Sequence, residues 1–163
     1  MLKTRRSGFM TTELMVVAVV LAILSGIAAS AVPTFATRAK RSALASTLAV
    51  VQGASDRFYV EANQYPAASQ PTAGMRAVRI SSSATDPSGL KFVGGYLHSE
   101  PNARAVDYGL SQADGATVYY GVTAGGRVFA TQSQPDQDQW ATGTIKVYTQ
   151  ESCDGSLTLS AIW

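Results

Sequence analysis

The sequence contains very few of the residues that build metal centres and nucleophilic active sites. Its 163 residues include one cysteine, Cys153, and one histidine, His98. A single cysteine excludes an intrachain disulfide, and together with one histidine it falls short of the usual ligand set of a zinc site. The chain also has no nucleophile and base motif and no glycine-rich phosphate loop. We therefore predict that the protein is not an enzyme and needs no cofactor.

The few candidate ligand residues have plainer interpretations. We expect Cys153 to be a small, half-buried hydrophobic residue near the last strand, with an intermolecular disulfide or a reactive thiol as alternatives. We expect His98 to be a loop or surface residue. Asp136 and Asp138 are spaced like two oxygen ligands of a calcium loop. The rest of that ligand set is missing, so a solvated acidic turn is favoured over a metal site.

Charge is also scarce, and it is unevenly distributed. Charged residues make up 15% of the chain, and the formal net charge is +2. Lys3, Arg5 and Arg6 lie among the first eight residues, and without them ten basic residues stand against eleven acidic ones. No strongly clustered basic surface of the kind that binds nucleic acid remains, so a nucleic-acid partner is not indicated.

The longest stretch without charge runs from Leu14 to Thr37. Its 24 positions exceed the roughly 20 residues that a helix needs to cross a membrane. Glu13 stands at the head of this stretch. A charged group in an apolar span is costly and is a functional candidate by default, although a carboxylate at a helix N-terminus is also stabilised by the helix dipole. The orientation is not set by charge, because basic residues flank the stretch on both sides: Lys3, Arg5 and Arg6 before it, and Arg38, Lys40 and Arg41 after it.

The segment Ser7–Val17, SGFMTTELMVV, resembles the cleavage and methylation motif of type IV prepilins. In that motif a glycine precedes the scissile bond, a phenylalanine follows it, and a glutamate is the fifth residue of the mature chain. The resemblance implies that a membrane-embedded prepilin peptidase cuts between Gly8 and Phe9 and N-methylates Phe9. A glycine suits the position before the bond, because a backbone without a side chain enters a protease cleft easily.

The resemblance also implies a role for Glu13 in assembly. Cleavage creates an α-amine at Phe9, which in this family pairs with the glutamate of a neighbouring subunit or of the same one. Leaving one member of a buried ion pair without its partner costs about 3 to 5 kcal/mol. We therefore expect Glu13 to fix the height at which a subunit docks in a polymer.

Two other interpretations of the N-terminus are possible. An ordinary secretory signal would be cut after a site such as Ala29-Ser30-Ala31, and an unrelated signal anchor would not be cut at all. The length of the apolar run and the carboxylate at its head argue against the first. The proline that many prepilins carry at the position of Ser30 is absent, and Pro33 follows three residues later. We predict a helix kink at Pro33, near residues 29 to 33.

The remaining chain predicts a globular domain. Leu44, Leu48, Val51 and Phe58 recur at helical spacing, so we expect an amphipathic helix that continues to about residue 62 and ends before Tyr65-Pro66. A long loop should occupy 67–90, with one extended piece at 77–80. Further strands are predicted at 105–110, 117–122, 127–131, 144–150 and 157–163, with a hairpin turn at Gly125 and Gly126. Neighbouring Tyr119 and Tyr120 should point to opposite faces of their strand, so that at least one joins the core.

These elements define an α+β fold. A long N-terminal helix, hydrophobic in its first half and amphipathic in its second, should pack on an antiparallel sheet of about four to six strands. The predicted organisation is a leader at 1–8, a transmembrane and polymerisation helix at 9–37, and a globular pilin domain at 38–163. Arg38, Lys40 and Arg41 would either pair with lipid phosphates before assembly or form a solvated face.

The resemblance implies a structural subunit of a type IV pilus. Its partners would be other pilin subunits, prepilin peptidase, an inner-membrane assembly platform and, before assembly, membrane lipid. The protein would first cross the inner membrane once and then join a pilus at the cell surface. The alternative is a pseudopilin of a type II secretion or competence (DNA-uptake) system. A different class, an enzyme or lipid-binding domain on a signal anchor, would need a polar site that the sequence does not show.

Overall fold

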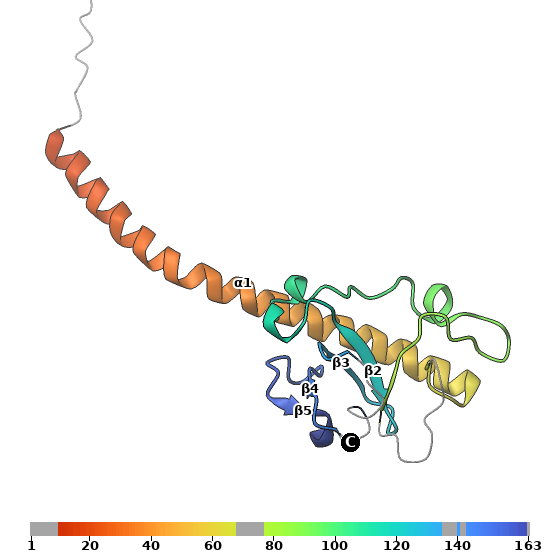
Figure 1. Cartoon of the computed structure of the whole chain (residues 1–163). Helices are drawn as coiled ribbons and strands as arrows, with labels where there is room; N and C mark the ends of the chain where they lie inside the picture. The colour runs from red at the N-terminus through yellow and green to blue at the C-terminus, as the bar shows by residue number, and fades with distance from the viewer. Residues whose placement is uncertain (1–9, 68–76, 135–139, 141–142, 163) are drawn as a thin grey trace, which may run out of the picture. The chain divides into compact units, whose positions relative to one another are not determined.

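A computed structural model describes residues 10–67, 77–134, 140 and 143–162. The protein is a mixed α+β protein, and its described residues include one long helix, α1 (Thr11–Ala62), and five short strands (Figure 1). Its chain divides into two compact units, Met1–Thr37 and Arg38–Trp163. Each unit is described by itself.

The first unit contains the apolar part of α1. The segment Thr11–Ala28 has a mean hydropathy of 2.1, and it is long and apolar enough to cross a membrane, as the sequence predicts. Helical structure continues through residue 33, so Pro33 does not end the helix. The kink expected there stays a prediction.

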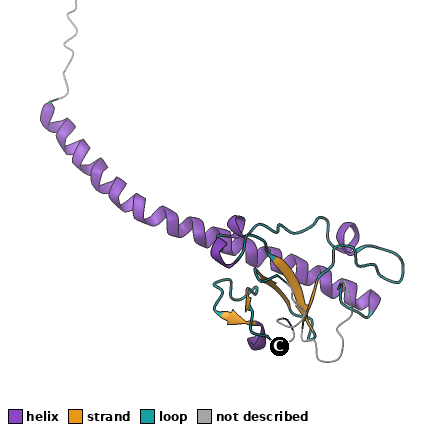
Figure 2. Cartoon of the chain, in the orientation of Figure 1, coloured by secondary structure: helices purple, strands orange, loops and turns teal. Residues whose placement is uncertain are grey.

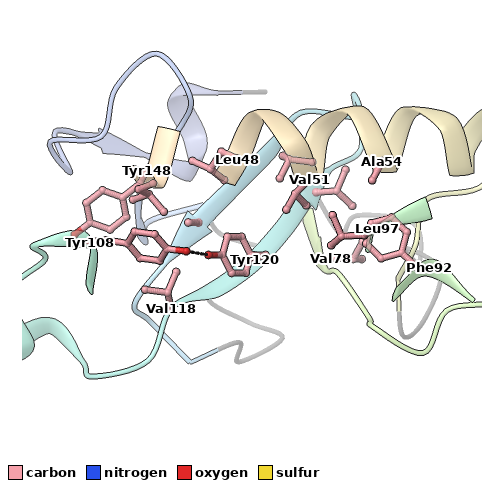
Figure 3. Close-up of a cluster of buried hydrophobic side chains, with 14 of the residues drawn as sticks. Leu48, Val51, Ala54, Val78, Phe92, Leu97, Tyr108, Val118, Tyr120 and Tyr148 are labelled. Carbon is pink, nitrogen blue, oxygen red and sulfur yellow. Dashed lines mark hydrogen bonds between the residues drawn. The ribbon is translucent and has the colours of Figure 1, made fainter. Parts of the chain in front are cut away.

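In the second unit, α1 presents one apolar face to the core. Leu44, Leu48, Val51 and Phe58 are at most 1% exposed, which confirms the predicted helical stripe (Figure 3). The helix ends at Ala62, where it was expected to end. Asn63 then takes a left-handed conformation with φ 51°, which asparagine tolerates better than most residues and which stops the helical hydrogen bonding.

The strands form two antiparallel sheets, seen in orange in Figure 2. β1 (Ala77–Arg79), β2 (Tyr119–Thr123) and β3 (Val128–Thr131) pair in that order, with Val78 opposite Val122 and Tyr120 opposite Ala130. β4 (Lys146–Val147) and β5 (Leu157–Thr158) form the second sheet. An isolated bridge between Ala130 and Tyr148 joins the residue after β4 to β3. The described strands therefore divide between two sheets, whereas the sequence analysis expected one.

The predicted β2–β3 hairpin is present. The turn closes when the backbone N–H of Gly126 donates to the Thr123 carbonyl oxygen at 2.9 Å. Gly126 has φ 86°, the left-handed conformation of a three-residue hairpin loop with a glycine bulge. Of the two glycines, only Gly126 adopts the positive φ that glycine allows, because Gly125 has no positive φ.

Two predicted strands are wrong in part or in full. The segment 105–110 forms a 3-10 helix at Ala105–Tyr108, which the left-handed Gly109 ends. The described part of the segment 157–163 is a strand only at β5 and continues as another 3-10 helix, Leu159–Ala161. Both errors have one cause: the buried residues are spaced three apart, which fits a 3-10 turn. The strand predicted at 144–150 is present but is limited to β4.

The three-stranded sheet has a core on each face. Val78 and Tyr120 belong to the cluster that packs against α1, whereas Ala77 and Phe129 belong to a second cluster with Trp140. Because alternate strand residues point to opposite faces, the helix covers one face and the C-terminal segments cover the other. The rings of Phe129 and Trp140 are 5.3 Å apart.

Candidate assembly site

Glu13 lies in the first turn of α1. Its backbone N–H donates to the Met10 carbonyl oxygen at 2.9 Å, and the residue is exposed. The positive end of the helix dipole stabilises a carboxylate at this place. No residue in the described part of the chain forms an ion pair with it. Gly8 and Phe9, the predicted processing residues, lie outside the described residues.

The side chains that follow Glu13 form an apolar surface on every side of the helix. The large hydrophobic residues between Leu14 and Ile27 are each 48–71% exposed. They are Leu14, Met15, Val16, Val17, Val19, Val20, Leu21, Ile23, Leu24 and Ile27. A helix that is apolar all round lacks the polar face that would suit one side to water, and an exposed apolar surface of this size marks a site of membrane or protein contact.

Covering this surface is strongly favourable. Removing a single Val, Leu, Ile or Met side chain from water contributes about 1.5 to 3 kcal/mol. The apolar part of α1 therefore has a large driving force to enter lipid or to pack against other apolar helices. The arrangement suits partition and association.

The loop after β1 is held to the end of α1 by a polar cluster. The buried carboxylate of Asp86 accepts hydrogen bonds from the Tyr96 hydroxyl at 2.6 Å, the Ser88 hydroxyl at 2.7 Å and the Leu90 N–H at 2.8 Å. The Tyr96 hydroxyl also contacts the carboxylate of Glu61, near the end of α1. The donated hydrogen bonds, Tyr96 first and Ser88 second, lower the pKa of Asp86 to about 2. The same bonds to Asp86 and Glu61 raise the pKa of Tyr96.

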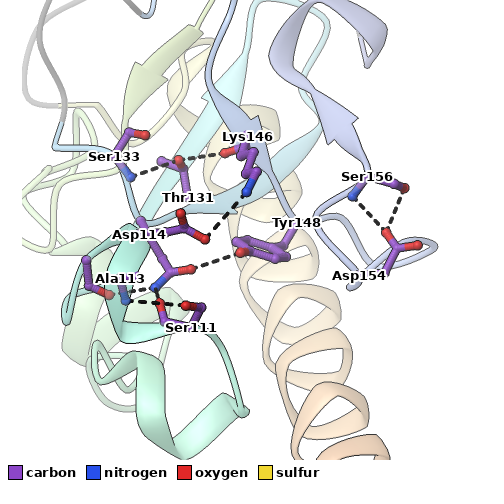
Figure 4. A network of polar contacts seen from close by, with 11 residues as sticks. Ser111, Ala113, Asp114, Thr131, Ser133, Lys146, Tyr148, Asp154 and Ser156 are labelled. Carbon is purple, nitrogen blue, oxygen red and sulfur yellow. Dashed lines mark hydrogen bonds and ion pairs between the residues drawn. The ribbon is translucent and has the colours of Figure 1, made fainter.

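A second polar cluster joins segments that are distant in sequence (Figure 4). The Tyr148 hydroxyl donates to Gln132 Oε1 at 2.8 Å, and Gln132 Nε2 donates to the carbonyl oxygens of Ser111 at 2.7 Å and Gly115 at 2.6 Å. Burial is the main cause of the raised pKa of Tyr148. Both the oxygen and the nitrogen of the Gln132 amide therefore have hydrogen-bond partners. A fully bonded buried amide is typical of a network that holds the fold together.

The large aromatic residues and the candidate ligand residues fall mostly in structural positions. Tyr120, Tyr148 and Trp140 are buried. Tyr120 belongs to the cluster that packs against α1, so one residue of the pair Tyr119 and Tyr120 joins the core, as expected. His98 is exposed and Cys153 is half-buried, as expected. Asp136, Asp138 and Trp163 lie outside the described residues. Among the residues that the structure describes, no three His, Cys, Asp or Glu side chains are grouped to hold a metal ion.

A cavity lies between α1 and the β1–β2 edge. It has a volume of about 380 Å³ and is lined on the core side by Val51, Phe92, Val118 and Tyr120. The other lining residues include Ser81, Ser82 and Glu100. The apolar floor of the cavity belongs to the main core.

Sequence reasoning missed the Asp86 cluster, although a signal was present. Asp86-Pro87-Ser88-Gly89 has aspartate, proline and glycine at the first, second and fourth positions of a turn. In the structure the Gly89 N–H donates to the Asp86 carbonyl oxygen at 3.0 Å. The turn motif would have located Asp86, but its contact with Tyr96 depends on the tertiary fold.

Comparison of the chain with protein-family models, with curated proteins and with solved structures gives no match.

Proposed function

We propose that this protein is a structural subunit of a type IV pilus. The observation that carries the proposal is the apolar helix whose surface no described part of the chain covers, with Glu13 in its first turn, ahead of a folded α+β unit. The resemblance of Ser7–Val17 to the prepilin motif supports the same function. The subunit is inserted in the inner membrane through its N-terminal helix and later polymerises at the cell surface.

Assembly follows from the chemistry of the N-terminus. Prepilin peptidase cuts between Gly8 and Phe9, and the new amine at Phe9 becomes the partner of a Glu13 carboxylate. The apolar helices then leave lipid and pack against one another. A subunit at the wrong height would leave the amine and the carboxylate unpaired in an apolar core, at a cost of about 3 to 5 kcal/mol. The charge pair thus selects the register, and the apolar surface supplies the driving force.

The mature N-terminus provides the first test. Mass spectrometry of the protein from cells should find a chain that begins at N-methylated Phe9. A chain that begins after Ala31 would identify a secretory signal, and a chain that begins at Met1 or Leu2 would identify an uncut anchor. Either result would overturn the proposal.

Substitution of Glu13 provides the second test. Glu13→Ala should leave cleavage at Gly8 intact and abolish incorporation into surface filaments, as seen by electron microscopy of sheared fractions. Thr12→Ala, one residue away in the same turn, is the matched control and should assemble normally. Filaments of normal number from Glu13→Ala would refute the role of the charge pair. Secretion or DNA-uptake defects without surface filaments would instead favour the pseudopilin alternative.

A further inference from the structure

A group of basic residues lies on α1 where it enters the globular unit. Arg38, Lys40 and Arg41 are all exposed. None of them takes part in an ion pair with another described residue. Three unpaired cations within four positions are an attractive target for anions.

The fold adds a second element to this group. Lys40 Nζ donates to the Val106 carbonyl oxygen at 3.1 Å, which holds the 3-10 helix Ala105–Tyr108 beside this part of α1. Arg104 precedes that helix with its side chain 75% exposed, and Val106 is a hydrophobic residue that is 37% exposed. We call Arg38, Lys40, Arg41, Arg104 and Val106 the basic patch.

An acidic residue, Asp107, lies within the same region. Asp107 is 3.9 Å from Arg104, and its carboxylate also accepts a hydrogen bond from Asn102 Nδ2 at 2.7 Å. It therefore offsets Arg104 in part and forms no ion pair with the three cations of α1. The patch combines positive charge with an exposed apolar side chain, the combination that suits a membrane interface.

Chain continuity sets the depth of the patch in a membrane. The uncharged stretch between Glu13 and Arg38 has 24 residues, which as a helix cover about 36 Å. The hydrocarbon core of a bilayer is about 30 Å thick. When this stretch fills the core, Arg38, Lys40 and Arg41 lie within the headgroup layer, because they directly follow its last residue.

We propose that the basic patch binds anionic phospholipid headgroups in the leaflet next to the globular unit. Guanidinium groups bind phosphate oxygens in pairs, and attraction to an anionic surface acts over about a Debye length. The hydrogen bond of Lys40 to Val106 brings the 3-10 helix to the same level. This inference rests on the membrane-anchored subunit of the proposed function and does not depend on polymerisation.

The test uses the full-length, uncut chain in lipid nanodiscs. A fluorophore is attached to Val106→Cys in a Cys153→Ser background, and headgroup-level lipid quenchers report its depth. Quenching should rise about threefold when phosphatidylglycerol replaces a third of the phosphatidylcholine, and it should fall again in 1 M salt. The control label is attached to Val60→Cys. Val60 lies 20 residues after Lys40 on α1 and is 82% exposed, and a label there should not respond to phosphatidylglycerol.

Charge-matched variants identify the residues responsible. The triple variant Arg38→Gln, Lys40→Gln and Arg41→Gln should lose the response to phosphatidylglycerol. The control neutralises three basic residues outside the patch, Arg57, Arg79 and Lys91, and should keep it. Far-UV circular dichroism should show equal helix content in both variants. An unchanged response in the first variant, or an equal loss in both, would overturn the proposal.

The remaining outcomes also decide the question. Quenching that is insensitive to phosphatidylglycerol would show that the patch is a solvated face and would refute the inference. A response that needs two chains in one disc would show that the basic patch contacts an acidic surface of a second copy. That result would also refute the lipid-binding proposal. Because the uncut chain is used, a failure to form filaments or a cut after Ala31 in cells would refute the proposed function without changing this readout.

Discussion

Gln52 Oε1 accepts a hydrogen bond from the backbone N–H of Val128 at 2.7 Å. The Nε2 group of the same amide donates to the Gly126 carbonyl oxygen at 2.8 Å and to Asp56 Oδ1 at 2.8 Å. A side chain of α1 thus bonds both a donor and an acceptor of the hairpin backbone, as a neighbouring strand would. This contact fixes the helix to the start of β3.

Gln52→Glu should destabilise the globular unit by about 1 to 3 kcal/mol. The carboxylate keeps the shape of the amide but cannot donate to Gly126, and it places a second negative charge four residues from Asp56. Urea unfolding of the full chain in detergent, followed by near-UV circular dichroism, measures the change. Gln112→Glu, at an exposed position, is the control. Equal midpoints for both variants would show that the Gln52 contact contributes nothing.

Gly126→Ala should destabilise the hairpin, whereas Gly125→Ala should not. Gly126 has φ 86°, and the ring of Tyr65 occupies the space that a Cβ would need. The left-handed conformation alone costs a non-glycine residue about 1 to 2 kcal/mol. At Gly125 a Cβ would meet only Thr123 Oγ1, at 3.9 Å. Thermal unfolding should separate the two variants by several degrees, and a reversed order would contradict the hairpin geometry.

The elements that the sequence predicts correctly are those defined by local patterns. The apolar repeat from Leu44 to Phe58 depends on one helix face, and the β2–β3 hairpin depends on alternation and a glycine turn. The expectation that at least one of Tyr119 and Tyr120 joins the core is met by Tyr120, because alternation depends on a single strand. Each of these features is decided by residues close together in the chain, so a sequence pattern is sufficient to find it.

The features that sequence reasoning misses depend on distant contacts or on competing periods. The two hydrogen bonds of Gln52 join residues 74 and 76 positions apart, and an isolated glutamine gives no sign of them. In the segment 105–110 the large apolar residues Val106, Tyr108 and Leu110 alternate, which predicts a strand. The fold instead buries Ala105 and Tyr108, which are three apart, as a 3-10 turn does. The same distinction holds for the candidate sites. Glu13 and the apolar run can be identified from the sequence, whereas the contact between Lys40 and Val106 is known only from the structure.

Stability should fall as the pH is lowered from about 4 towards 2. Tyr96 and Ser88 lower the pKa of Asp86 to about 2, and hydrogen bonds from Ser156 lower the pKa of Asp154 to about 2. An unfolded aspartate has a pKa near 3.9. The stabilisation is therefore complete above that value and is lost as the pH falls through the folded pKa. Thermal unfolding between pH 2 and pH 6 measures the loss.

Substitutions of the two aspartates separate their contributions. Asp86→Asn and Asp154→Asn should each reduce the change of the unfolding temperature between pH 2 and pH 4. The double variant should remove most of that change. Neither change should alter the shape of the curve above pH 5. A wild-type slope in the double variant would assign the acid sensitivity to other carboxylates.

Ser55→Ala should stabilise the globular unit. Ser55 is fully buried on the core face of α1, and its hydroxyl has no hydrogen-bond partner in the described part of the chain. Burial of an unpaired hydroxyl costs about 1 to 3 kcal/mol, and alanine removes it and has a higher helix propensity. Ser42→Ala, exposed on the same helix, isolates the propensity effect. If the two substitutions raise the unfolding midpoint equally, the buried hydroxyl is not the cause.

Cys153 should react slowly with iodoacetamide while the protein is folded. The thiol donates to the Thr149 carbonyl oxygen at 3.0 Å. Burial is the main cause of its raised pKa, and Asp154 raises that pKa further whereas Arg41 lowers it. Because the thiolate is the reactive form, alkylation at pH 8 should be about tenfold slower than in urea. Mass spectrometry over time measures both rates.

The charges near Cys153 predict opposite effects of two substitutions. Asp154→Asn removes a negative charge and should speed alkylation of the folded protein, whereas Arg41→Gln removes a positive charge and should slow it. Arg41→Gln should not change the rate in urea, where the thiol no longer lies near Arg41. Asp154 stays next to Cys153 in the unfolded chain, so the folded rate of Asp154→Asn is compared with the rate of the same variant in urea. If both variants alkylate at the native rate, burial alone protects the thiol. If folded and unfolded rates are equal, Cys153 is accessible and the half-buried environment assigned to it is wrong.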